Sequence, residues 1–120
     1  MINKVNLSEK LSSIDEYWSP KIVGELNGQQ VKVVKLKGSF VWHHHENEDE
    51  LFLVLKGILK IHLKDKTVQL NEGEFFIVPK GVEHKPAAED EVHLLLFEPA
   101  GTLNTGNITN ELTVNNPEKI

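Results

Sequence analysis

Hydrophobic and polar residues alternate with two different periods along this chain. Near the start, Leu7, Leu11, Ile14 and Trp18 recur at spacings of 4, 3 and 4 residues. That is the period of an amphipathic helix, in which one face of the helix is apolar. The pattern therefore predicts a helix in the first 20 residues.

Two residues bound this predicted helix. Ser8 is suited to the N-cap, because its side-chain oxygen can accept a hydrogen bond from a free backbone N–H. Pro20 ends the pattern, because proline does not continue a helix. We expect the helix to pack over the body of the protein with its apolar stripe facing inward.

From about residue 29 the pattern changes to short apolar segments separated by turns. The segments are QQVKVVKLKG, SFVWHHH, ELFLVLKG, ILKIHLKD, KTVQL, FFIVPKG and EVHLLLFEPAG. Short strands at such even spacing are typical of an all-β barrel or sandwich. The fold class predicted from the pattern is therefore all-β, with a short N-terminal helix.

Two of the predicted strands are apolar on both faces. Residues 51–55 read LFLVL and residues 94–97 read LLLF. A strand in a small barrel has one inward face, so something must cover the other face. The N-terminal helix, the C-terminal tail or a second subunit could do so, and we expect a homodimer.

A length of 120 residues suits one domain. Within it we expect an N-terminal helix and lead-in strand in residues 1–28, a barrel in residues 29–100 and a tail in residues 101–120. The tail is rich in Asn, Thr and Gly, so it is expected to be irregular, with its last few residues disordered.

Composition removes several kinds of function. The chain has no cysteine, which excludes disulfides, thiolate catalysis and cysteine–zinc sites. It has no apolar run long enough to span a bilayer and no secretory signal, so a cytoplasmic location without membrane partners is expected. The net charge of −5 argues against nucleic acid as a partner, and all 13 basic residues are lysines. We expect a small-molecule ligand instead.

Three consecutive histidines stand beside an acidic run in the stretch FVWHHHENEDELF, residues 40–52. They could form a solvated turn, an accidental cluster or a metal site. In a strand, His43 and His45 share one face and His44 takes the other. Two imidazoles on one face can bind one ion, and Glu50, at the start of the next strand, could add a carboxylate.

A second cluster lies in GEFFIVPKGVEHKP, residues 73–86. Gly73 opens a strand, whereas Pro79 and Gly81 mark its end and a turn. His84 follows this turn. A histidine placed at the mouth of a barrel in this way could complete a metal site.

Together these clusters resemble the two sequence signatures of the cupins. The first signature would consist of Gly38, His43, His45, Glu50 and Gly57; the second would consist of Gly73, Pro79, Gly81 and His84. Two departures are visible: the first gap is four residues where five is usual, and Ala88 stands where asparagine is frequent. Neither departure falls on a metal ligand of the family.

The resemblance implies a double-stranded β-helix, that is, a jelly-roll barrel that binds one divalent metal ion. By the same resemblance the metal ligands would be His43, His45, Glu50 and His84. The ligand set does not choose between zinc, manganese, iron, nickel and copper. More narrowly, DELFLVLKG and EPAGTLNTG are similar to the small single-domain cupins labelled phosphomannose-isomerase-like.

Other aromatic and histidine residues receive ordinary structural interpretations. We expect His44 at the surface, and His93 as a hydrogen-bonded core residue. Phe40 and Trp42 share the face of His44, so they are expected to pack under the helix or in a dimer contact, away from the ligands.

Two functions follow from a histidine–carboxylate metal site. One is an enzyme that isomerises or oxygenates a small polar metabolite, since the ion can act as a Lewis acid or, as iron, bind dioxygen. A sugar phosphate is a weaker candidate substrate because the chain has no arginine. The alternative is a non-catalytic, metal-dependent binding or sensing module. The sequence assigns no catalytic residue.

Overall fold

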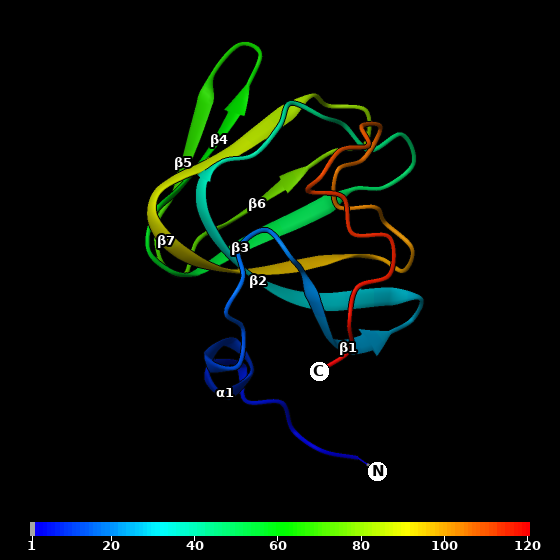
Figure 1. Cartoon of the computed structure of the whole chain (residues 1–120). Coiled ribbons are helices and arrows are strands. Elements are labelled where there is room, and N and C mark those ends of the chain that lie inside the picture. The colour runs from blue at the N-terminus through cyan, green and yellow to red at the C-terminus, as the bar shows by residue number, and fades with distance from the viewer. Residues whose placement is uncertain (1) are drawn as a thin grey trace.

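Two long antiparallel strands run side by side through the fold, and the other strands pair with them directly or through one further strand (Figure 1). The structure, a computed structural model, describes residues 2–120. In this range lie one helix and seven strands: α1 (Leu7–Ser12), β1 (Lys21–Leu26), β2 (Gln29–Ser39), β3 (Glu50–Lys56), β4 (Leu59–Leu63), β5 (Thr67–Leu70), β6 (Phe75–Val78) and β7 (His84–Pro99).

Strand β7 closes the barrel by changing partners along its length. Its second half lies between β2 and β3 in the order β1-β2-β7-β3-β6, whereas its first residues pair with β4, which pairs with β5. The change occurs where the register between β2 and β7 shifts, between Leu36 and Gly38. The prediction of an all-β jelly-roll barrel with a short N-terminal helix is confirmed.

The core fills the interior of the barrel and follows the alternation of the strands. Phe52 and Val54 of β3, and Leu94 and Leu96 of β7, point inward and are buried. Their neighbours in sequence point outward, so both strands carry apolar residues on two faces. No helix within residues 2–120 is long and apolar enough to cross a bilayer.

The helix is shorter than its apolar stripe predicts. Leu11 and Ile14 pack on Val33 of β2, as expected of a helix over the body. However, α1 ends at Ser12, and Trp18 lies outside it in a left-handed conformation with φ 61°. The hydroxyls of Ser12 and Ser13 bond to carbonyls three residues earlier, an alternative that competes with helix continuation.

The predicted N-cap is also wrong. Asn6 occupies that position, and its side-chain oxygen accepts a hydrogen bond from the N–H of Glu9 at 3.1 Å. At the other end of the chain the expected disorder is not found. The N–H of Ile120 donates to the carbonyl of Ile22, so the last residues pair with β1. The remainder of the tail is a series of turns, as predicted.

An apolar surface remains on the outer face of β6, β3 and β7. Two cross-strand rows form it: Ile77–Leu51–Phe97 and Phe75–Leu53–Leu95. Phe75 is 60% exposed and Ile77 is 49% exposed, and β6 stands at the edge of the sheet order. We call these six residues the outer apolar patch. Helix α1 lies against the neighbouring Leu55 and Val33.

Gly57 occupies a turn that admits no side chain. It connects β3 to β4 with φ 91°, and a Cβ atom built on it would lie 2.9 Å from the carbonyl oxygen of Glu91. Gly28, in the turn between β1 and β2, has a similar φ of 79° but open space around it. Substitution at the two positions can therefore distinguish the cost of a left-handed backbone from the cost of crowding by a side chain.

We expect Gly57→Ala to lower the free energy of unfolding by about 2–4 kcal/mol, because strain and overpacking add together. Gly28→Ala should cost only about 1–2 kcal/mol, which is the left-handed backbone term alone. Urea unfolding of both variants and the wild type measures the difference. Equal losses of stability would show that the turn at Gly57 relaxes to accommodate a methyl group.

Candidate metal centre

The segment that carries the three histidines is not a regular strand. Strand β2 ends at Ser39 and β3 begins at Glu50, and between them only His43 forms an isolated bridge, with His84. The two residues exchange backbone hydrogen bonds of 3.0 and 2.9 Å. This pair of bonds fixes the histidine segment against the start of β7.

Four side chains converge inside the barrel at this bridge. They are His43, His45, Glu50 and His84, with one ligand-type atom of each lying within 4.8 Å of the others. All four residues are at most 3% exposed. The structure thus brings together the four residues that the sequence suggests as ligands, from the histidine segment and the first residues of β3 and β7.

Two of the imidazoles are held in the tautomer that a metal requires. The Nδ1–H groups of His43 and His84 each donate to a backbone carbonyl two residues earlier, Val41 and Val82, at 2.9 Å. A carbonyl oxygen only accepts, so Nδ1 carries the proton and Nε2 keeps its lone pair for the site.

Several buried polar atoms in the cluster have no hydrogen-bond partner. They include Nε2 of His45, Nε2 of His84 and Oε1 of Glu50. Oε1 of Glu50 lies 3.2 Å from the first of these nitrogens and 3.6 Å from the second. Buried polar atoms normally find partners, so three such atoms facing one another indicate a missing group that accepts lone pairs. A divalent cation bound by nitrogen and oxygen fits this donor set.

The protonation states suit a cation as well. Burial, together with the neighbouring His84, lowers the pKa of His43 to about 4, so this imidazole is neutral at pH 7. Burial opposes ionisation of Glu50, but the close approach of His45 and His84 outweighs it and holds the pKa below its usual value. The cluster therefore offers the neutral imidazole of His43 and the carboxylate of Glu50.

A second buried carboxylate, Glu98 on β7, was missed by the sequence analysis. It is 2% exposed and pairs with the buried Lys32 of β2 at 3.5 Å. Burial raises the pKa of Glu98, and the negative charge of Glu50 raises it further. The signal was present: Glu98 follows Leu94 and Leu96 at period two, which places it on the inward face.

His44 points away from the cluster, as expected. Its ring bonds to Glu46 at 2.6 Å and Glu83 at 3.1 Å, and these hydrogen bonds raise its pKa. His93, expected in the core, instead faces outward and bonds to Glu91 at 2.7 Å. It alternates with Val92 and Leu94, which occupy the inward positions.

The expectation for Phe40 is wrong. Its ring meets that of His43 edge to face, with centroids 5.3 Å apart, and stacks on Trp18 at 4.7 Å. The chain leaves the β2 ladder after Ser39, so strict alternation does not continue to Phe40. Trp42 lies elsewhere, under the ammonium group of Lys64 at 4.1 Å, rather than under the helix.

The tail supports the histidine segment from outside. Asn107 accepts from the N–H of His44 through its side chain and donates its own N–H to the carbonyl of His44. A Cβ atom on Gly106 would collide with that carbonyl and lie 3.2 Å from the ring of His43. Only glycine fits this position.

Comparison with known proteins agrees with this geometry. The sequence model of the cupin domain family matches residues 30–98. The chain belongs to the cupin family. It is 36% identical to the uncharacterized protein YdbB of Bacillus subtilis (strain 168), over 67% of this chain and 72% of that protein.

Two further relatives extend the comparison of this cupin. A crystal structure of a cupin-2 domain containing protein from Shewanella frigidimarina is 43% identical, with a TM-score of 0.78, covering 79% of this chain and 93% of that one. The 3-hydroxyanthranilate 3,4-dioxygenase of Xenopus laevis is 28% identical over 82% of this chain but only 37% of its own length.

We expect His45→Ala to weaken divalent metal binding at least about tenfold, because it removes an unpartnered nitrogen from the cluster. His44→Ala is the matched control and should leave the affinity within about twofold, since its ring faces away. Titration of metal-free protein with Co²⁺, followed by visible absorption, measures both. Equal effects of the two variants would show that the ligand register is wrong.

Proposed function

We propose that this cupin is a metal-dependent enzyme that acts on a small organic molecule, with one divalent ion per chain. One observation carries the proposal: unpartnered atoms of His45, Glu50 and His84 face one another inside the barrel. His43 and Glu50 also line a cavity that opens beside them. The ligand groups are therefore accessible to a molecule that enters the cavity.

The residues at this centre would have different roles. His43, His45, Glu50 and His84 would hold the ion, and the ion would supply Lewis-acid or oxygen chemistry. All four residues are buried, and the low local dielectric constant strengthens electrostatic interactions inside the site. The buried Glu98 contacts Lys32 at 3.5 Å and forms a side-chain hydrogen bond with Glu50, and so supports the position of Glu50.

Oxygenase-like chemistry is the first candidate reaction and isomerase-like chemistry the second. The relation to 3-hydroxyanthranilate 3,4-dioxygenase supports the first, as do the histidine and carboxylate ligands. The likeness to phosphomannose-isomerase-like cupins supports the second, but that label rests on similarity of fold and names no substrate.

We also propose a cytoplasmic location, which the absence of cysteine supports.

A second candidate function is non-catalytic binding or sensing. Among the residues that the structure describes, His43 and Glu50 are the titratable ones that line the cavity. Because both belong to the metal cluster, no separate proton-transfer group contacts a bound molecule directly. That arrangement suits a binding module as well as an enzyme whose ion does the chemistry.

We expect the protein purified without an affinity tag or chelator to contain close to one divalent ion per chain, and His84→Ala to lose it. Elemental analysis of both proteins, in parallel, measures the content. Iron would favour oxygenation and lead to an oxygen-consumption assay; zinc, nickel or manganese would favour Lewis-acid chemistry or binding. Protein that takes up none of these ions on addition would refute the proposal.

The outer apolar patch supports a homodimer. Its six residues form two uncharged rows on the sheet, and the edge strand β6 offers unpaired backbone groups beside them. Edges of this kind readily pair with another chain. We therefore propose that a second copy of the chain covers the patch.

Wild-type protein at micromolar concentration should sediment as a dimer, and Phe75→Glu should sediment as a monomer. Ile58→Glu is the matched control, because Ile58 is 54% exposed but lies outside the patch. Sedimentation velocity gives the mass of each. A monomeric wild type, or a dimer that survives Phe75→Glu, would contradict the proposed interface.

A further inference from the structure

The cavity beside the metal cluster has walls of unusual composition for a site that would bind a polar metabolite. The cavity volume is about 40 Å³, and it lies within a wider recess of about 370 Å³ that is open to solvent. Twelve residues line it: Trp18, Pro20, Val34, Leu36, Phe40, His43, Glu50, Phe52, Pro86, Leu94, Leu96 and Asn104. Nine of these are apolar or aromatic. The walls therefore favour an apolar body in the occupant.

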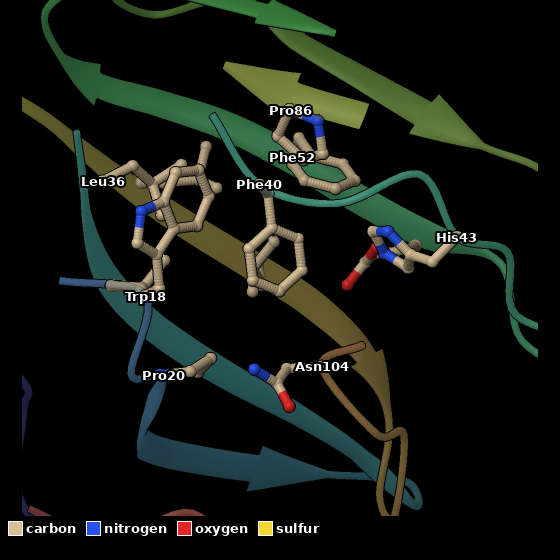
Figure 2. A pocket seen from close by; sticks show the side chains of 12 residues that line it. Trp18, Pro20, Leu36, Phe40, His43, Phe52, Pro86 and Asn104 are labelled. Atoms are coloured by element: carbon tan, nitrogen blue, oxygen red, sulfur yellow. The ribbon is translucent and has the colours of Figure 1, made fainter. Parts of the chain in front are cut away.

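Aromatic rings form a continuous wall that leads to the cluster (Figure 2). Trp18 and Phe40 stack with ring planes 18° apart, and Phe40 then meets the ring of His43 edge to face. Phe52 meets the ring of His84 in the same way, with centroids 5.9 Å apart. Two phenyl rings that line the cavity thus contact two of the proposed ligand histidines.

Trp18 is held at the cavity against a backbone cost. Its φ of 61° is costly for a bulky residue. Two hydrogen bonds compensate: its backbone N–H donates to the carbonyl of Lys35, and its indole N–H donates to that of Lys37, both at 2.9 Å. Strain that surrounding bonds maintain is typical of residues placed for a function.

The polar groups of the wall are already engaged, except at the cluster. The amide of Asn104 donates to the carbonyl of Leu112 and accepts from the N–H of Val114, each at 2.8 Å. Among residues 2–120 no lysine lines the cavity. The buried Lys32 lies outside that lining and pairs with Glu98. A phosphate group would find no cationic side chain here.

We propose that the cavity binds a small aromatic molecule of the phenol class, with its ring against Phe40 and Phe52 and its oxygen directed at the metal centre. This inference rests on the proposed function for the metal but adds the class of substrate. It replaces the polar metabolite expected from sequence. Aromatic walls favour an aromatic ring over a saturated one of similar size, since aromatic pairs gain from their stacking geometry.

The test uses the fluorescence of Trp18 as its reporter. Trp42→Phe removes the second tryptophan, which lies outside the cavity lining, so excitation selective for tryptophan reports on Trp18. The protein is loaded with Zn²⁺, its zinc content is measured by elemental analysis, and it is titrated with phenol, cyclohexanol or glucose 6-phosphate. We expect a saturable change with phenol, binding of cyclohexanol weaker by about threefold or more, and no response to glucose 6-phosphate.

Two further variants test whether the ring of bound phenol lies against Phe40. In the Trp42→Phe background, Phe40→Leu keeps an apolar side chain but removes a ring, and should weaken phenol binding about three- to tenfold. Phe75→Leu makes the same change on the outer apolar patch and should leave phenol binding unchanged. Circular dichroism and thermal unfolding check that both variants fold. Metal-free protein should bind phenol more weakly than the zinc-loaded form.

The outcomes separate this inference from the proposed function. Zinc bound without a phenol response overturns the aromatic ligand and leaves the metal function standing. Failure to hold zinc, and equally iron, nickel or manganese when each is added in its place, overturns the proposed function and the direction given to the phenol oxygen. Equal or tighter binding of cyclohexanol or glucose 6-phosphate overturns the aromatic class, as does equal phenol affinity of Phe40→Leu and Phe75→Leu.

Discussion

The structure depends on one constraint: four polar side chains are buried together without enough protein partners. A buried polar group left unpaired costs about 1–3 kcal/mol, so an arrangement with several such groups must be held by other forces. The double backbone bond between His43 and His84 and the apolar core on β3 and β7 supply them. A bound cation would turn this destabilising cluster into a stabilising one, because binding to the folded state alone favours folding.

The two faces of the barrel strands serve two different purposes. Inward residues of β2, β3 and β7 pack the core and present the cluster, while outward residues of the same strands form an apolar surface. The N-terminal segment connects the two. Its helix covers part of the outer face at Val33, and a few residues later it reaches the cavity with Trp18 and Pro20. A single short segment therefore shields the sheet and completes the cavity wall.

The sequence predicted the elements that rest on local patterns. Strand positions followed from alternation and turn residues, and His43, His45, Glu50 and His84 followed from spacing and family resemblance. Elements that depend on tertiary contacts were missed. The helix was too long in the prediction because serine hydroxyls compete locally for carbonyls, and Phe40 was misplaced because the chain leaves its strand before it. The roles of Trp18 and Asn104 arise from segments far apart in sequence, which no local pattern reports.

The tail contacts the histidine segment, so the end of the chain can influence the histidine–carboxylate cluster inside the barrel. Gly106 and Asn107 contact His44, which lies between two of the proposed ligands, His43 and His45. Whatever holds those ligands in place also favours the docked tail, and coupling between two sites is reciprocal. Undocking of the tail would therefore loosen the hold on an ion by the same free energy. A partner that binds the tail would in this way change the affinity of the barrel for a metal ion.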